Sequence, residues 1–322
     1  MKFIVSSIFI ILLLCQCNSY QDNKVVINRF DKELLFVIEN YSDTDYMAFE
    51  SDNLSMFRLY HSAILKGNNY NLDNKSAFEF ISNIINKPEF NKLYKDVQLE
   101  FAEMSSEEIA LTKCIGNYRK LFNETYFPDI YTHVSPFGYS IITTDSLISI
   151  SLDNYMGTDY QGYKGLFYNY QLAKKTRSKI VPDIFKGWIY ARYPNYAQTL
   201  VEGMIYEGAV LYSVENIIED CNIEDIIGYN ADISEWCKDN ESKIWNAIIK
   251  SNHLYSNDKI IYSKYMNDAP FCSALGNDVP AEIGKWIGYR IVSNYIHEKG
   301  INSLKKIING DIQVVEILKS YK

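Results

Sequence analysis

The spacing of apolar residues changes twice along this chain of 322 residues, and this change constrains the fold most. From residue 27 to 122, apolar side chains recur every three or four positions, which predicts amphipathic helices. From residue 130 to 152 the apolar segments are short and β-rich, and helical spacing returns from residue 182. This order predicts an α+β fold that is mostly helical around a small central antiparallel or mixed sheet.

Three segments before the predicted sheet each carry one apolar face, at residues 27–38, 78–85 and 90–97. A fourth segment runs to Phe122 and opens with Ser105 and Glu108, which have the spacing of a capping box. In that motif the Ser side chain and the Glu side chain each accept a hydrogen bond from the other residue's backbone N–H. The sequence therefore predicts a helix that Ser105 caps.

Three short strands are predicted, at residues 130–134, 139–143 and 147–152. In the last one Ile148 and Ile150 alternate with Ser149 and Ser151, which predicts a strand that is buried on one face only. Residues 144–146 are expected to form a hairpin turn. Four later helices are predicted, from Pro182 to about Arg192, from Thr199 to about Glu219, from about Ala231 to Ser251 and from about Ala281 to Glu298.

The N-terminus has the pattern of a lipoprotein export signal. Lys2 precedes an apolar run from Phe3 to Leu14, and cysteines follow it at positions 15 and 17. The run holds roughly a dozen residues, fewer than the ~20 that a spanning helix needs. We expect acylation of Cys17, with Cys15 as the alternative, and acyl chains that hold the protein on a membrane. The predicted organisation is a signal peptide at 1–16, a lipidated tether at 17–24 and one domain at 25–322.

Composition bears on two questions: which partners the protein can bind and whether its cysteines form disulfides. The formal net charge is −8 and no basic stripe occurs, so nucleic acid is not an expected partner. Four of the six cysteines lie in the body of the chain, at positions 114, 221, 237 and 272. An exported protein could pair them as two disulfides in any of three ways, or keep them as buried free thiols.

The common catalytic and metal-binding motifs are missing from the sequence. It contains no HExxH, no GxSxG and no GxxxxGKS, and no two of its four histidines are four residues apart. His133 and Ser135 lie two apart on a predicted strand, which favours a surface pair over a catalytic one. We therefore predict no catalytic residues, no metal site and no cofactor.

Two glutamates of one predicted helix, Glu202 and Glu207, are candidates for a catalytic carboxylate pair. A spacing of five residues separates them by about 140° around the helix axis, so they cannot face a common substrate. Glu207 falls near the apolar face of the helix, where an unpaired charge is costly. This position predicts either a buried salt bridge, a place on the rim of the core, or a functional carboxylate.

Many short segments, in order along the chain, resemble one family. They are Ile27–Leu34, Leu152–Tyr160, Val181–Asp183, Met204–Gly208, Ile227–Tyr229, Glu235–Cys237, Asn240–Glu241, Ile244–Trp245, Leu254–Ser256, Ala269–Phe271, Ile283–Gly284 and Trp286–Val292. Together with the lipoprotein cysteine, they resemble the GldB-like gliding-motility lipoproteins of Bacteroidetes. The resemblance implies an envelope lipoprotein linked to gliding and to the type IX secretion apparatus.

The same resemblance implies a distant likeness to zincin-type peptidases. In those enzymes a helix with HExxH precedes a helix with a Glu–Gly pair. The helix from Asp183 to Arg192 takes the first place and holds no His, while Glu207 and Gly208 match the pair. Glu207 is thus a degenerate ligand position, and the likeness implies a pseudoenzyme scaffold.

The leading functional hypothesis is a non-enzymatic accessory that binds other proteins of the envelope. It is expected on the periplasmic side of the outer membrane. Tyr155, Tyr160 and Tyr163, in a Gly-bearing loop, are candidate contact residues because exposed Tyr is favoured at interfaces, although plain packing explains each of them as well. The alternatives are a degenerate zincin-like metallopeptidase or peptidoglycan hydrolase, and a binder of an envelope glycan.

Overall fold

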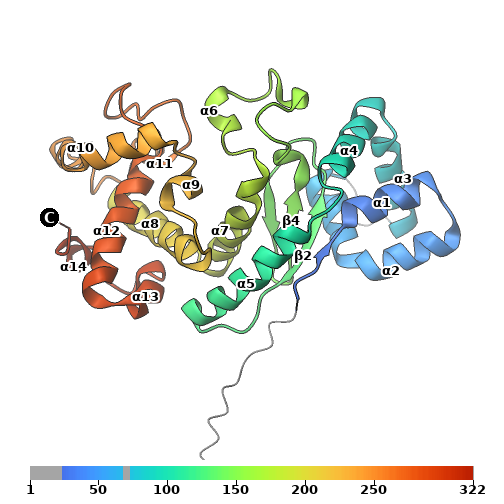
Figure 1. Cartoon of the computed structure of the whole chain (residues 1–322), viewed down its shortest axis with the longest axis horizontal. Coiled ribbons are helices and arrows are strands. Elements are labelled where there is room, and N and C mark those ends of the chain that lie inside the picture. Colours follow the sequence, from blue (N-terminus) through green and yellow to red (C-terminus); the bar gives the residue numbers. More distant parts are fainter. Residues whose placement is uncertain (1–23, 68–72, 322) are drawn as a thin grey trace, which may run out of the picture.

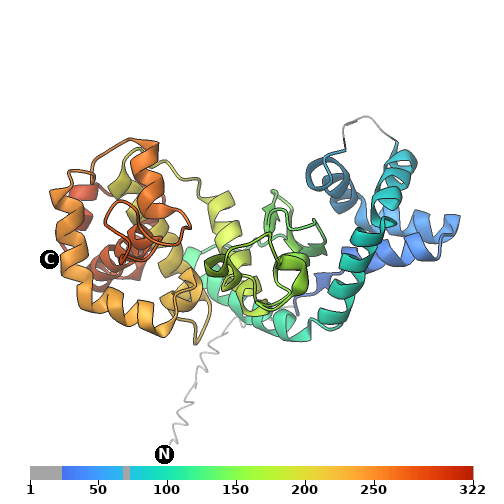
Figure 2. The same ribbon diagram turned by 90° about the horizontal axis from the view of Figure 1, so that it is seen from above.

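The predicted α+β fold is confirmed. The computed structural model describes residues 24–67 and 73–321. It places helices at both ends of the long axis and a small sheet between them (Figure 1). Figure 2, seen from above, shows the same succession of helices, sheet and helices. The predicted signal peptide with Cys15, and all of the predicted tether with Cys17 except Lys24, lie outside the described residues.

The N-terminal helices pack around aromatic rings. Phe30 and Tyr60 are fully buried and meet edge to face, with ring centroids 5.2 Å apart, an arrangement that aromatic pairs favour. The Tyr60 and Tyr94 hydroxyls are 2.6 Å apart, which ties two helical segments together inside the core. The elements of this part are α1 (Phe30–Glu39), α2 (Asp43–Leu59), a π-helical turn η1 (Tyr60–Ile64), α3 (Asn74–Ile85), α4 (Pro88–Glu100) and α5 (Ser105–Phe122).

The predicted capping box at the start of α5 is wrong. Met104 occupies the cap position, and Ser105 is the first helical residue, without a capping hydrogen bond from its side chain. Glu108 instead accepts a hydrogen bond from the backbone N–H of Ile27 at 3.1 Å. The Glu is therefore used to fix the first strand against α5, which local sequence spacing does not reveal.

The sheet is mixed and has four strands in the order β1-β2-β4-β3. The parallel strands β1, β2 and β4 pair Ile27 with Ile130 and Ile130 with Ile148, and β3 runs antiparallel to β4. The predicted hairpin turn at 144–146 joins these last two strands, with the Thr144 N–H donating to the Leu147 carbonyl. Their bounds are β1 (Ile27–Asn28), β2 (Asp129–His133), β3 (Ile141–Thr143) and β4 (Leu147–Ser151).

The prediction that the last strand is buried on one face only is wrong. All five residues of β4 are buried. Because β4 is flanked by β2 and β3, its position is internal, and the side chains of Ser149 and Ser151 form hydrogen bonds within the protein. Alternation of Ile and Ser thus marks an apolar face and a buried polar face, not a solvent face.

The C-terminal helices are built on two that cross closely, α8 and α12. Thr199 caps α8 by accepting from the Glu202 N–H, and Glu202 accepts in turn from the Thr199 N–H. Glycines lie where the two helices meet, at Gly208 and Gly288. The elements are α6 (Asn169–Leu172), α7 (Ile180–Arg192), α8 (Leu200–Ile217), α9 (Ile223–Ile227), α10 (Ala231–Lys250), α11 (Lys259–Met266), α12 (Ile283–Lys299), α13 (Leu304–Ile308) and α14 (Val314–Leu318).

The four cysteines of the body are free thiols. Cys114, Cys237 and Cys272 are buried and Cys221 is half-buried. Of the alternatives that the sequence left open, the structure has unpaired thiols. Within residues 24–67 and 73–321, no helix is long and apolar enough to cross a membrane.

Candidate functional site

A cleft of about 280 Å³ lies where α7 and α8 meet α9 and the start of α12. Its lining residues belong to α7, α8, α9, the start of α12 and the segment after α6. Figure 1 shows where these elements lie in the chain. Its lining is rich in charge. Five lysines and four carboxylates line it, namely Lys174, Lys175, Lys179, Lys186, Lys285, Asp183, Glu207, Asp268 and Glu282.

Helix α7 directs Asp183, Lys186 and Tyr190 into this cleft. Their spacing of three and four residues places them on one face of the helix. Asp183 and Lys186 form an ion pair at 2.7 Å, and the buried Tyr155 donates its hydroxyl to Asp183 at 2.9 Å. The face of α7 that lines the cleft thus carries an ion pair and a tyrosine.

Glu207 of α8 is half-buried and lines the same cleft. Its carboxylate accepts a hydrogen bond from the Tyr190 hydroxyl at 2.7 Å. Of the placements predicted for Glu207, the structure has the one on the rim of the core. Glu202 instead caps the N-terminus of α8. The two glutamates therefore do not face a common site, as their angular separation predicted.

Glu282 is the centre of the ion pairs on the opposite wall. It is buried and forms ion pairs with Lys174 and with Lys285, the latter at 2.7 Å. Burial raises the pKa of Glu282, but the charges of Lys285 and Lys174 outweigh burial and hold it below its usual value. For Lys285, burial lowers the pKa, and Glu282 together with Glu207 raises it above the usual value.

The backbone at Glu282 is strained. Its φ is 58° and its ψ is 17°, the left-handed region that side chains other than Gly and Asn rarely adopt. Strain of this kind persists only where the surrounding contacts enforce it, and it concentrates at functional sites. Here the two lysine partners hold the Glu282 side chain inside the wall of the cleft.

The histidines do not assemble into a site. His61 lies in η1, His133 in β2, His253 after α10 and His297 near the end of α12. Among the residues that the structure describes, no group of three or more His, Cys, Asp or Glu is placed to hold a metal ion.

A second polar cluster, which sequence reasoning missed, lies inside the protein at the end of β2 and β4. His133 Nδ1 is 2.6 Å from Ser149 Oγ, while its Nε2 is buried and has no hydrogen-bond partner. The prediction of a surface pair between His133 and Ser135 is wrong, because His133 is fully buried and Ser135 contacts Ser151. Burial lowers the pKa of His133 to about 3, although the nearby Asp31 carboxylate opposes the shift.

The candidate contact tyrosines pack inward. Tyr155 and Tyr163 are 1% and 2% exposed, and Tyr160 is half-buried with its hydroxyl bonded to Asp96 at 2.7 Å. The exposure that the interaction hypothesis needed is therefore missing for Tyr155 and Tyr163. Exposed aromatic residues of this region are instead Tyr139 and Tyr168. A partner contact at this loop stays a prediction.

Comparison with protein families gives one match. The family described as "Gliding motility protein GldB" matches residues 16–322. No curated protein and no solved structure matched the chain.

Proposed function

Since the chain belongs to the GldB family of gliding-motility proteins, we propose that it is a lipid-anchored accessory of the gliding or type IX secretion machinery. In this proposal Cys17 carries the acyl chains, and the folded part faces the periplasm from the outer membrane. The protein acts by binding other proteins of the envelope complex and performs no catalysis.

A non-enzymatic role is supported by the side chains that α7 and α8 contribute to the cleft. A zincin-type hydrolase needs ligands from both helices that converge on one metal ion. Here α7 contributes Asp183, Lys186 and Tyr190, and the Asp183 carboxylate is engaged by the lysine at 2.7 Å. Tyr190 donates a hydrogen bond to Glu207, the glutamate of the Glu–Gly pair. A lysine among these groups repels a divalent cation.

The experiment is replacement of Cys17 by Ser in a gliding host that carries the gene. We expect Cys17→Ser to abolish acyl labelling, to release the protein from the membrane fraction and to lower gliding or type IX secretion, because one thioether-linked cysteine carries the whole anchor. Cys15→Ser is the matched control and is expected to leave all three readouts unchanged. Unaltered membrane association of Cys17→Ser would refute the anchor.

The proposed lack of catalysis is tested on the full-length protein, purified in detergent. Zinc content far below one equivalent, before and after loading with zinc, is expected for an accessory protein. Near-stoichiometric zinc that is lost on Glu207→Gln would contradict the proposal and favour a metal-dependent hydrolase.

A further inference from the structure

Two lysines of the cleft differ from the others in lacking an acidic partner. Lys174, Lys186 and Lys285 are each paired with a carboxylate. The Nζ of Lys175 donates to the Asn154 side-chain oxygen at 2.6 Å, and that of Lys179 donates to the Asp225 backbone carbonyl. Among the described residues, no carboxylate is within ion-pairing distance of either Nζ.

These two cations are also withdrawn from water. Both side chains are half-buried, and Lys175 Nζ lies 3.9 Å from the centroid of the Phe167 ring. Burial lowers the pKa of both lysines, although neighbouring carboxylates partly oppose it. Placing a cation in a partly dry cleft without a counter-charge costs stability. Such a cost is typical of a binding site that is completed by its ligand.

The charge of the cleft differs in sign from the charge of the whole chain. The whole chain has 32 Lys and Arg against 40 Asp and Glu, so its surface as a whole is acidic. The lining of the cleft has the opposite balance, with five lysines against four carboxylates. Asp153 and Asp225 lie near Lys175 and Lys179 without forming an ion pair with them. A concave region with surplus positive charge raises the local concentration of anions.

We propose that this cleft binds a small anionic ligand, and that Lys175 and Lys179 hold its carboxylate or phosphate oxygens. A volume of about 280 Å³ suits a ligand of small-molecule size. The strained Glu282, fixed between Lys174 and Lys285, sets the opposite wall. This inference goes beyond the role in motility and does not depend on the identity of the protein partner.

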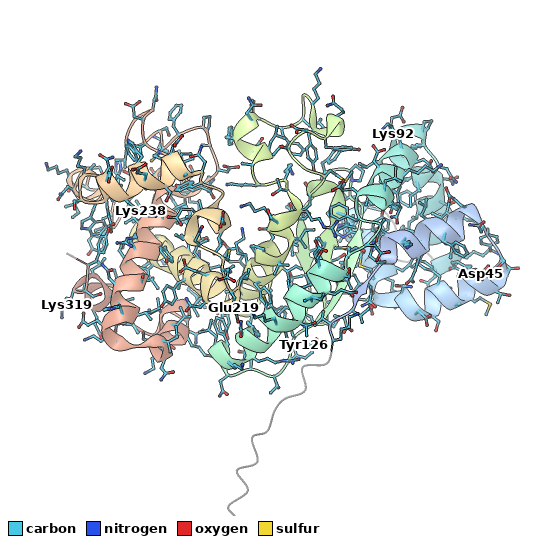
Figure 3. The ribbon with its side chains drawn as sticks, viewed as in Figure 1. Asp45, Lys92, Tyr126, Glu219, Lys238 and Lys319 are labelled. Atoms are coloured by element: carbon cyan, nitrogen blue, oxygen red, sulfur yellow. The ribbon has the colours of Figure 1, made fainter. Side chains whose placement is uncertain are left out.

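The test is calorimetric titration of the full-length protein at low salt with inorganic phosphate and, separately, with succinate. Saturable binding of one of the two is expected, and the probe that binds identifies the oxyanion. Lys175→Met and Lys179→Met should each weaken binding by roughly tenfold, as expected for loss of one charged hydrogen bond. Lys319→Met, at an exposed lysine labelled in Figure 3, is the matched control and should bind like the wild type.

Thermal unfolding of the same variants supplies a second readout. Each Met removes a desolvated cation that has no acidic partner but also removes one hydrogen bond, to Asn154 or to the Asp225 carbonyl. Because these two effects oppose each other, the melting temperatures of Lys175→Met and Lys179→Met should stay close to that of the wild type. Lack of saturable binding of both probes, or equal binding by the two variants and the wild type, would overturn the proposal. A fall in melting temperature with unchanged binding would assign both lysines to structure and overturn it as well.

Discussion

At the scale of single residues, the buried His133 links the fold to pH. Its folded-state pKa is about 3, against 6.5 for an unperturbed side chain. Between these two pH values His133 is protonated in the unfolded chain but neutral in the folded protein. Its contribution to the free energy of unfolding is therefore fully present at neutral pH and is lost as the pH falls from 6.5 toward 3. The loss from this residue is up to about 1.4 kcal/mol per pH unit.

We therefore expect His133→Asn to flatten the fall in the free energy of unfolding between pH 7 and pH 5, although the variant is less stable at neutral pH. Chemical denaturation at several pH values measures this slope. The buried His61, whose pKa is also lowered by burial, leaves some slope in the variant. His297→Asn, at an exposed position, is the control. Parallel curves for His133→Asn and the wild type would contradict the assignment.

The residues of the cleft show what one sequence can and cannot predict. Glu207 was identifiable because a carboxylate near the apolar face of a helix is unusual. Lys175 and Lys179 lie in a polar stretch without periodicity, and nothing local sets them apart. Their surroundings come from distant segments, as the pairing of Lys174 with Glu282 illustrates, and tertiary folding alone brings these together.

At the scale of elements, the crossing of α8 and α12 depends on two glycines. A Cβ added at Gly208 would lie 2.2 Å from the Gly288 carbonyl carbon, and one added at Gly288 would lie 1.7 Å from the Met204 carbonyl oxygen. Both obstacles are backbone atoms, which cannot rotate away. Helix packing alone therefore explains why a glycine occupies position 208, independently of any catalysis.

We expect Gly288→Ala to destabilise the protein by about 3 kcal/mol or more, because the helices must separate to admit the methyl group. In a helix without such a contact the same change stabilises by up to about 1 kcal/mol, so the sign of the effect identifies the close approach. Thermal or urea unfolding measures it. Ser293→Ala on the same helix is the control, and a Gly288→Ala protein as stable as the wild type would refute the argument.

Periodicity predicted the long amphipathic helices well, since α3, α4, α7, α8, α10 and α12 each overlap a predicted helical segment over most of their length. It predicted no helix over α2, in which buried Tyr46, Phe49 and Met56 are interspersed with acidic residues. The pairing of Gly208 with Gly288 was not predictable either, because eighty positions separate them and packing partners are not encoded locally.

At the scale of the whole molecule, Glu124 joins three separate parts. Its carboxylate accepts from Tyr118 of α5 at 2.9 Å, from Tyr193 just after α7 at 2.6 Å, and from Lys305 of α13 at 3.3 Å. Burial raises its pKa, but hydrogen bonds from Tyr193, Tyr118 and the cations outweigh burial and lower it. Its ionised form therefore stabilises the fold above the unfolded-state pKa, and this contribution is lost as the pH falls through the folded-state value.

We expect Glu124→Gln to lower the free energy of unfolding by about 1–3 kcal/mol at pH 7, the range for hydrogen bonds to a charged group. The difference from the wild type should be smaller at pH 3 than at pH 7, because acidification adds a proton to the wild-type carboxylate. Unfolding at both pH values is the measurement, with Glu235→Gln at an exposed position as the control. A difference that is the same at both pH values would contradict the ionic role.

The unpaired thiols have a consequence for how such a protein is made. Burial raises the pKa of Cys114 to about 11 and that of Cys237 to about 12, so almost none of either is the reactive thiolate at neutral pH. Maturation in an oxidising compartment then needs no disulfide-forming catalyst. We therefore expect the described fold to form in a reducing cytosol as well, since none of these four cysteines is paired.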